Sequence, residues 1–144
     1  MNHSDERHAL VEAARGWLNT PYHHRARIKS AGVDCAQLLI GVYADAGLIS
    51  AFDTGEYPPD WMLHREEERF LAWIDQYLVE VEQPLPGDVV IWRFGRSFSH
   101  GAIVTHWPEF IHAWRVAGCV CLGNLEQDLD LSRRSVRFYS FFKG

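Results

Sequence analysis

The feature that most constrains the fold is a change in the spacing of apolar residues near the middle of the chain. Upstream of residue 84 they recur three and four positions apart, the period of a helix with one buried face. Downstream of Pro84-Leu85-Pro86-Gly87 the pattern becomes alternating, and β-branched and aromatic residues dominate. Helices followed by strands with short turns predict an α+β domain, with N-terminal helices packed on a C-terminal antiparallel β-sheet.

Three helices are expected in the first half of the chain. Ser4 is expected to cap the first helix, which runs to about Leu18 because Pro21 cannot extend it. The second helix begins behind Asp34, buries one apolar stripe and ends at Gly47. The third is predicted from about residue 60, with an apolar face that reaches residue 81. Segments 22–32 and 48–59 are predicted to be surface loops, the first forming one wall of a cleft.

Five strands are expected in the second half, over residues 89–94, 98–105, 109–115, 119–122 and 136–142. Short turns at 95–96 and 107–108 predict antiparallel neighbours. Cys119 and Cys121 point the same way along their strand, which side-chain packing explains, with a metal or redox role as the weaker alternative.

Length and composition favour one domain over residues 1–144. Of the 144 residues 47% are hydrophobic, and 14 basic against 19 acidic residues give a net charge of -5, which argues against a nucleic-acid partner. No apolar run approaches the roughly 20 residues that span a membrane. The first residues lack a signal-peptide pattern, so synthesis in the cytoplasm without a signal peptide is expected. Three cysteines leave at least one free thiol.

Cys35 is the candidate nucleophile. It follows the helix-capping carboxylate of Asp34 and lies in the first turn of an apolar helix, whose partial positive charge favours a thiolate. We therefore expect Cys35 to react at a lower pH than an ordinary cysteine. The alternative is that Cys35 is a small buried hydrophobe.

Two histidines lie in consecutive predicted strands and complete a candidate catalytic group. If the turn between the strands is centred on His106, His100 and His112 lie opposite each other on one face, with Cβ atoms about 5 Å apart. A centre between His106 and Trp107 would place them on opposite faces, so an odd loop or a bulge is required. His100 could then take the thiol proton while His112 orients its ring.

A metal site is a weaker interpretation of the histidine-rich loop. His23 and His24 are adjacent, and adjacent side chains rarely point at one ion. No acidic or thiol ligand stands nearby at the spacing of a zinc finger.

Several of these segments together resemble the NlpC/P60 cysteine peptidases of bacterial cell walls. The resemblance lies in Thr20-Pro21-Tyr22, Gly32-Val33-Asp34-Cys35, Pro86-Gly87-Asp88-Val89-Val90, His100-Gly101-Ala102-Ile103-Val104 and Phe110-Ile111-His112-Ala113. It implies a papain-like fold with Cys35 as nucleophile, His100 as base and acid, and His112 as the orienting residue. It further implies substrate contacts from Tyr22, Asp34, Ala36 and Gln37, although Ala36-Gln37 replaces the usual Ser-Gly of the family.

The resemblance implies hydrolysis of an amide in peptidoglycan stem peptides, typically between D-glutamate and diaminopimelate, without a metal or cofactor. The long segment before Gly32 and the missing signal peptide resemble the forms encoded with phage tails and gene transfer agents. Such a form would act at the cell wall, with phage tail proteins as candidate partners. Two alternatives are a papain-like amidase or deamidase that acts on a protein, and a catalytically silent tail assembly module.

Overall fold

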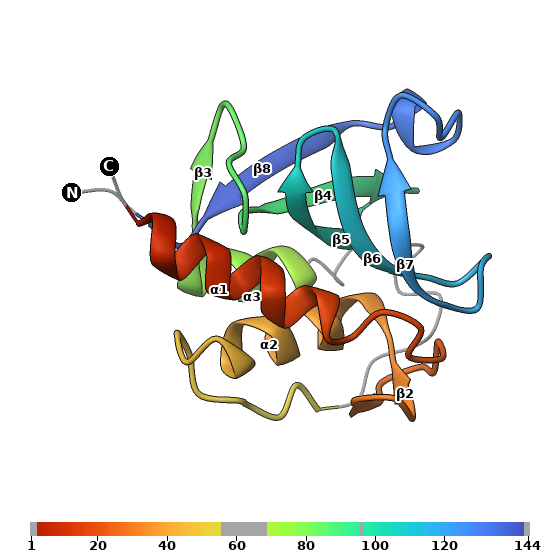
Figure 1. The fold of residues 1–144 in the computed structure, drawn as a ribbon. Helices are drawn as coiled ribbons and strands as arrows, with labels where there is room; N and C mark the ends of the chain where they lie inside the picture. The colour runs from red at the N-terminus through yellow and green to blue at the C-terminus, as the bar shows by residue number, and fades with distance from the viewer. Residues whose placement is uncertain (1–2, 56–68, 96, 143–144) are drawn as a thin grey trace.

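The computed structural model describes residues 3–55, 69–95 and 97–142. Its three helices lie together on one side of a curved six-stranded sheet, and the N- and C-termini lie at the same end of the molecule (Figure 1). The helices are α1 (Ser4–Arg15), α2 (Cys35–Asp45) and α3 (Arg69–Tyr77). This arrangement confirms the predicted α+β fold with N-terminal helices on an antiparallel sheet.

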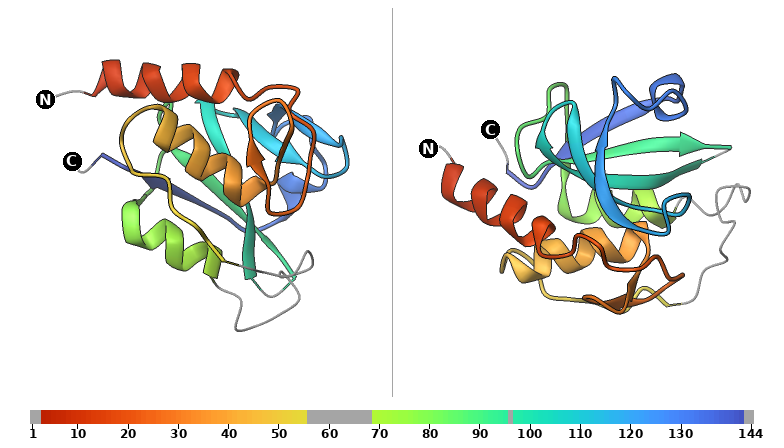
Figure 2. Two further views of the ribbon diagram at one scale, coloured as in Figure 1. Left: turned by 90° about the horizontal axis from the view of Figure 1, so that it is seen from below. Right: turned by 45° about the vertical axis from the view of Figure 1, so that its right-hand side comes forward.

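The sheet is antiparallel throughout. Its strands follow the order β3 (Val79–Val81), β8 (Val136–Ser140), β4 (Val89–Phe94), β5 (Ser97–His106), β6 (Glu109–Trp114) and β7 (Cys119–Asn124). A short 3-10 helix, η2 (Leu131–Arg133), precedes β8, and a separate two-stranded hairpin joins β1 (Arg27–Ile28) to β2 (Gly32–Val33). Figure 2 shows α2 between α1 and α3 beneath the sheet.

Each face of the sheet is covered by its own apolar cluster, as alternation of side chains along a strand requires. The face toward the helices contributes the buried residues Val89, Ile91, Ile103, Ile111, Ala113 and Val120 to the main core. The opposite face holds a smaller cluster of Val90, Trp92, Ala102, Val104, Phe110 and Leu131. Both faces are therefore protected from water along β4, β5 and β6, the strands that reach the candidate site.

Helix α2 is the most enclosed element of the fold. All residues from Cys35 to Tyr43 are buried, so the helix is covered on every side rather than along the single stripe that was predicted. Gly41 allows this close packing, because a Cβ at that position would lie 2.5 Å from the Trp17 ring. The Trp17 indole donates a hydrogen bond to Asp45 at the far end of α2 (3.0 Å). The start of α2 is thus held in a fixed place under the sheet.

The structure corrects several predicted boundaries. Helix α1 begins at Ser4, with His3 at the cap and no side-chain cap bond, and it ends at Arg15. From there the chain continues to Thr20 as turns with i to i+3 hydrogen bonds, and Asn19 takes a left-handed φ of 71°. Gly47 takes the predicted left-handed conformation after α2 (φ 78°).

The remaining differences concern short elements. The predicted loop 22–32 contains β1 and the start of β2, and Val81 lies in β3 rather than in a helix because residues 79–81 pair with β8. The predicted start of the third helix at Asp60 lies outside the described residues. The five predicted strands are confirmed with shifts of one or two residues at their ends.

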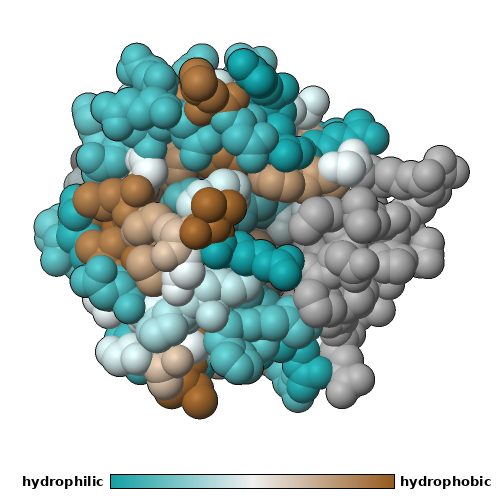
Figure 3. Space-filling view, turned by 90° about the vertical axis from the view of Figure 1, so that its right-hand side faces the viewer, coloured by the Kyte–Doolittle hydropathy of each residue, from teal (hydrophilic) through white to brown (hydrophobic). Residues whose placement is uncertain are grey.

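The surface shows no helix suited to a bilayer. Among the described helices none combines the length and the apolar character needed to span a membrane. At the end of the molecule that carries the β6–β7 turn, apolar side chains form separate groups among hydrophilic ones (Figure 3).

Candidate active site

Cys35 and His100 share one cavity of about 190 Å³. The cavity lies where the start of α2 meets the ends of β4, β5 and β6. Its lining consists of Tyr22, Cys35, Phe94, Ser99, His100, Ala113, Trp114, Arg115, Val116 and Asp130. Polar, aromatic and titratable side chains therefore converge on the predicted nucleophile.

The local sequence places Cys35 at the first position of α2. Asp34 takes the N-cap in an extended conformation, and its carboxylate accepts hydrogen bonds from the backbone N–H of Gln37 (2.9 Å) and of Arg25 (2.8 Å). This cap confirms the predicted helix start. The Cys35 thiol is 7% exposed and donates a hydrogen bond to the backbone carbonyl of Ser99 (3.3 Å).

His100 and His112 are in direct contact. The Nε2 of His100 lies 2.9 Å from the Nδ1 of His112, so one ring donates a hydrogen bond to the other, and the second nitrogen of His100 is left for another partner. The pair lies on one face of the sheet, as predicted, but the two residues are not directly opposite. Ile103 pairs with Ile111, so in this register His112 continues beside Ala102, two residues away from His100.

A bulge belongs to this hairpin, as the sequence required for some registers. The pairing shifts by one residue between Val104 and His106, next to the turn. The side chains of a diagonal pair are farther apart at Cβ than those of an opposed pair, and two imidazole rings are long enough to close that gap.

Aromatic rings hold His100 in place. Trp92 stacks on it with ring centroids 5.5 Å apart, Trp114 lies at 4.9 Å, and Phe94 meets it edge-on at 5.8 Å. Because this cage buries the ring, the pKa of His100 falls well below its ordinary value, and the neighbouring His112 and Arg134 lower it further. Burial likewise lowers the pKa of His112 to about 4, although Asp128 opposes the shift. Both rings are neutral at pH 7.

The thiol of Cys35 is also neutral in the resting protein. Burial raises its pKa well above the ordinary value, and the Asp34 carboxylate raises it further. The backbone N–H groups of Gly101, Ala36 and Cys35 lower it by less. The expectation of a resting thiolate is therefore wrong, because the field of the helix start is outweighed by the loss of water around the sulfur.

The remaining predicted site residues are in different surroundings. Tyr22 lines the cavity, and burial raises the pKa of its phenol, which stays protonated. Asp34 is buried, and both of its oxygens accept backbone hydrogen bonds. Gln37 is buried and donates to Thr54 (2.9 Å), while Ala36 lines a different cavity.

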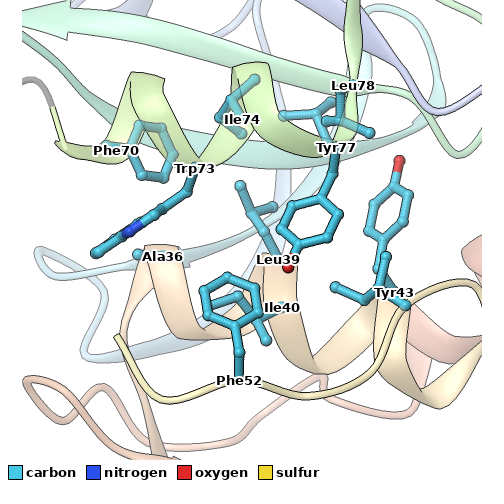
Figure 4. A pocket seen from close by; sticks show the side chains of 12 residues that line it. Ala36, Leu39, Ile40, Tyr43, Phe52, Phe70, Trp73, Ile74, Tyr77 and Leu78 are labelled. Carbon is cyan, nitrogen blue, oxygen red and sulfur yellow. The ribbon is translucent and has the colours of Figure 1, made fainter. Parts of the chain in front are cut away.

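This second cavity lies between α2 and α3 and is apolar. Figure 4 shows aromatic and aliphatic side chains pointing into it from both helices and from Phe52. It contains none of the nucleophilic or basic groups of the first cavity. The first turn of α2 thus presents Cys35 to the polar cavity and Ala36 to the apolar one.

Several residues of the Cys35 cavity were not predicted. Ser99 precedes His100, and Trp114 and Arg115 follow His112 by two and three positions. Their proximity in sequence to the two histidines was a usable signal. Phe94 and Asp130 reach the cavity from β4 and from the segment before η2, and no local pattern marks them.

The other candidate ligands do not gather into a metal site. No group of three or more His, Cys, Asp or Glu side chains in residues 3–55, 69–95 and 97–142 is placed to hold an ion. Cys119 and Cys121 are partly buried free thiols on β7, next to Trp114 and His112 of β6.

Comparison with solved structures identifies the fold. Over 91% of its length the chain superposes on the NlpC/P60 domain of the peptidoglycan hydrolase SagA, with a TM-score of 0.62 and 21% identity. This chain has the NlpC/P60 fold. An NlpC/P60 family protein from Bacillus cereus (TM-score 0.67, 17% identity, 95% of this chain) and the peptidoglycan hydrolase RipB from Mycobacterium tuberculosis (0.66, 13%, 98%) share it.

The NlpC/P60 fold makes up different shares of these proteins. The chain spans 96% of the SagA domain, 67% of the RipB structure and 40% of the Bacillus cereus protein. A scan against protein-family models and a search among curated proteins give no match. The likeness is therefore one of three-dimensional structure.

Proposed function

We propose that this protein is a cysteine peptidase that hydrolyses an amide bond in peptidoglycan stem peptides, with residues 1–144 as one NlpC-type domain. The proposed bond joins D-glutamate to diaminopimelate. The observation that carries the proposal is the cavity in which the Cys35 thiol and the His100 imidazole meet while His100 is hydrogen-bonded to His112 (2.9 Å). A nucleophile, a base and an orienting group are the parts that acyl transfer requires.

The reaction begins from a neutral pair, because burial favours the thiol and the neutral imidazole. As the sulfur attacks the amide carbon, His100 takes the thiol proton as a general base. The imidazolium then gives this proton to the leaving nitrogen, and the C–N bond breaks to release an amine and leave a thioester on Cys35. Water adds to the thioester with His100 again as base, which releases the acid and restores the thiol.

The start of α2 supports the negatively charged oxygen of the tetrahedral intermediate. The backbone N–H of Cys35 lies in the first turn of the helix, where it has no partner within the helix itself. His112 keeps the His100 ring in one orientation throughout, and the Tyr22 phenol at the cavity wall is a protonated hydrogen-bond donor toward the attacked carbonyl.

The solved relatives support the substrate. SagA and RipB are named peptidoglycan hydrolases, and a protein from Bacteroides uniformis with the same fold (TM-score 0.62, 14% identity, 96% of this chain) is named an N-acetylmuramoyl-L-alanine amidase. The amidase cuts a different amide in the same polymer, so the bond must be read from the products.

We also propose that the protein acts at the cell wall, delivered by a phage tail or a similar particle. The support is the sequence resemblance to forms encoded with such particles. Protein amidase or deamidase activity and a silent assembly module are the alternatives.

Digestion of purified peptidoglycan by the wild type and by Cys35→Ala tests this function. We expect the wild type to release fragments with new D-glutamate and diaminopimelate termini in mass spectra, and the variant to release none. Fragments cut at the muramoyl amide would instead indicate an amidase. Equal release by both proteins, or none by either, would contradict the proposal.

A further inference from the structure

The cavity around Cys35 has two charged side chains in its lining, and only one of them is neutralised. Asp130 accepts hydrogen bonds from Nε and Nη2 of Arg134, both at 3.1 Å. The Arg134 guanidinium also stacks on Phe94, 3.6 Å from the ring centre. The negative charge of Asp130 is therefore balanced within the protein.

Arg115 has no such balance. It lies on the cavity wall, is exposed, and forms no ion pair or side-chain hydrogen bond among the described residues. It is close enough to the Tyr22 phenol to lower its pKa, against the larger effect of burial. The cavity of an otherwise acidic protein, with a net charge of -5, thus has one uncompensated positive charge.

The backbone on which Arg115 is mounted is fixed. Arg115 directly follows β6, and the turn back to β7 is closed by a hydrogen bond from Gly118 N–H to the Trp114 carbonyl (2.9 Å). The Gly118 carbonyl accepts a hydrogen bond from Tyr22 N–H (2.8 Å), which ties the turn to the opposite wall of the cavity. A guanidinium on a fixed turn is a better anion receptor than one on a loose loop, because less ordering is needed on binding.

The neighbouring side chain matches this chemistry. Val116 is 84% exposed and also lines the cavity. A guanidinium beside an aliphatic surface suits a ligand that carries a carboxylate on a short aliphatic arm. A merely solvated surface arginine would need neither the fixed turn nor the position next to the nucleophile.

We propose that Arg115 is a specificity residue that binds a free carboxylate of the substrate next to the scissile amide. This inference rests on the proposed function for the identity of the substrate. It names the feature that would be read: stem peptides with a free carboxylate at this position are cleaved faster than those in which it is amidated.

The first test measures the charge preference of the cavity without peptidase activity. Cys35 is alkylated with iodoacetate, an anion, or iodoacetamide, its neutral analogue, and the rates are followed by mass spectrometry of the Cys35 peptide. We expect the iodoacetate-to-iodoacetamide rate ratio to fall about fivefold in Arg115→Gln. Arg15→Gln is the matched control, because it removes the same charge from the surface of α1, and its ratio should equal that of the wild type. An unchanged ratio in Arg115→Gln would overturn the inference.

The second test uses two synthetic stem peptides that differ only in whether this carboxylate is free or amidated. We expect the wild type to prefer the free acid by about tenfold in kcat/KM, and Arg115→Gln to lose that preference while still cleaving the amidated peptide. A preference that survives in Arg115→Gln would contradict the inference. If neither peptide is cleaved, the proposed function fails, whereas the alkylation ratio still decides whether Arg115 attracts a carboxylate.

Discussion

The two parts of the candidate site are built in different ways. The nucleophile depends on a local device, a helix cap in which the Asp34 carboxylate binds the N–H of a residue three positions later. The histidine pair depends on strand register, a bulge and an aromatic cage drawn from β4, β5 and β6. The comparison suggests that the helix part tolerates changes around it, whereas small shifts of the strand part are felt directly at His100.

The largest effects are expected where each part loses its reacting group. Cys35→Ala and His100→Ala should each lower kcat by about 10⁴-fold or more, since no nearby group replaces the thiolate or the proton transfer. The double variant should be no worse than either single one in a stem-peptide assay. Losses that multiply would show that the two groups do not act as one unit.

Replacing His112 separates orientation from chemistry. His112→Gln can still accept a hydrogen bond from the His100 ring, so we expect about a tenfold loss of kcat, against about 100-fold for His112→Ala. Steady-state assays with the same peptide, and thermal unfolding to check the fold, would measure this. Equal inactivation by Gln and Ala would mean that His112 also transfers a proton.

Gly123→Ala would disturb the strand part without removing any of its groups. A Cβ there would lie 2.5 Å from the Phe110 ring and 3.1 Å from Nε2 of His112, so both rings must move. We expect a loss of about 1–3 kcal/mol in the free energy of unfolding and about a fivefold loss in kcat. A variant that is less stable but fully active would show that the position of His112 has more latitude than the aromatic cage indicates.

Asp34→Asn probes the helix part and should have the smallest effect. Because the carboxylate raises the pKa of the Cys35 thiol, removing its charge should lower that pKa and increase the alkylation rate a few-fold at neutral pH. The amide can still cap the helix, at a cost of about 1 kcal/mol for the bond to Arg25 N–H. Asp45→Asn, at the other end of α2, is the control. An alkylation rate and pH profile equal to the wild type would exclude a role for Asp34 in setting the thiol pKa.

The same contrast explains what could be predicted from the sequence. The cap at Asp34, the helix behind Cys35 and the five strands follow from residues close together in the chain, and the structure confirms them. The contact between His100 and His112 was predicted through the turn around His106, but the exact pairing was not, because a bulge near the turn sets the register. Strand β3 was missed because its three residues follow directly on a helix.

The charge state of the site could not be predicted from local sequence. A helix start favours a thiolate when the sulfur is in water, and only the packing of the whole domain shows that Cys35 is buried. Arg115 and Asp130 likewise become relevant only when the fold brings them to one cavity, 15 residues apart in the chain.

The most direct test of the site is to trap the acyl group on Cys35. A stem peptide is mixed with excess wild-type enzyme, quenched in acid within the first turnover, and the protein is digested and analysed by mass spectrometry. We expect the acyl half of the peptide to be attached as a thioester to the fragment that contains Cys35, to be released by hydroxylamine, and to be absent from Cys35→Ala. Cleavage of the peptide by Cys35→Ala at the wild-type rate, with no adduct on Cys35 of the wild type, would contradict a covalent mechanism at this site.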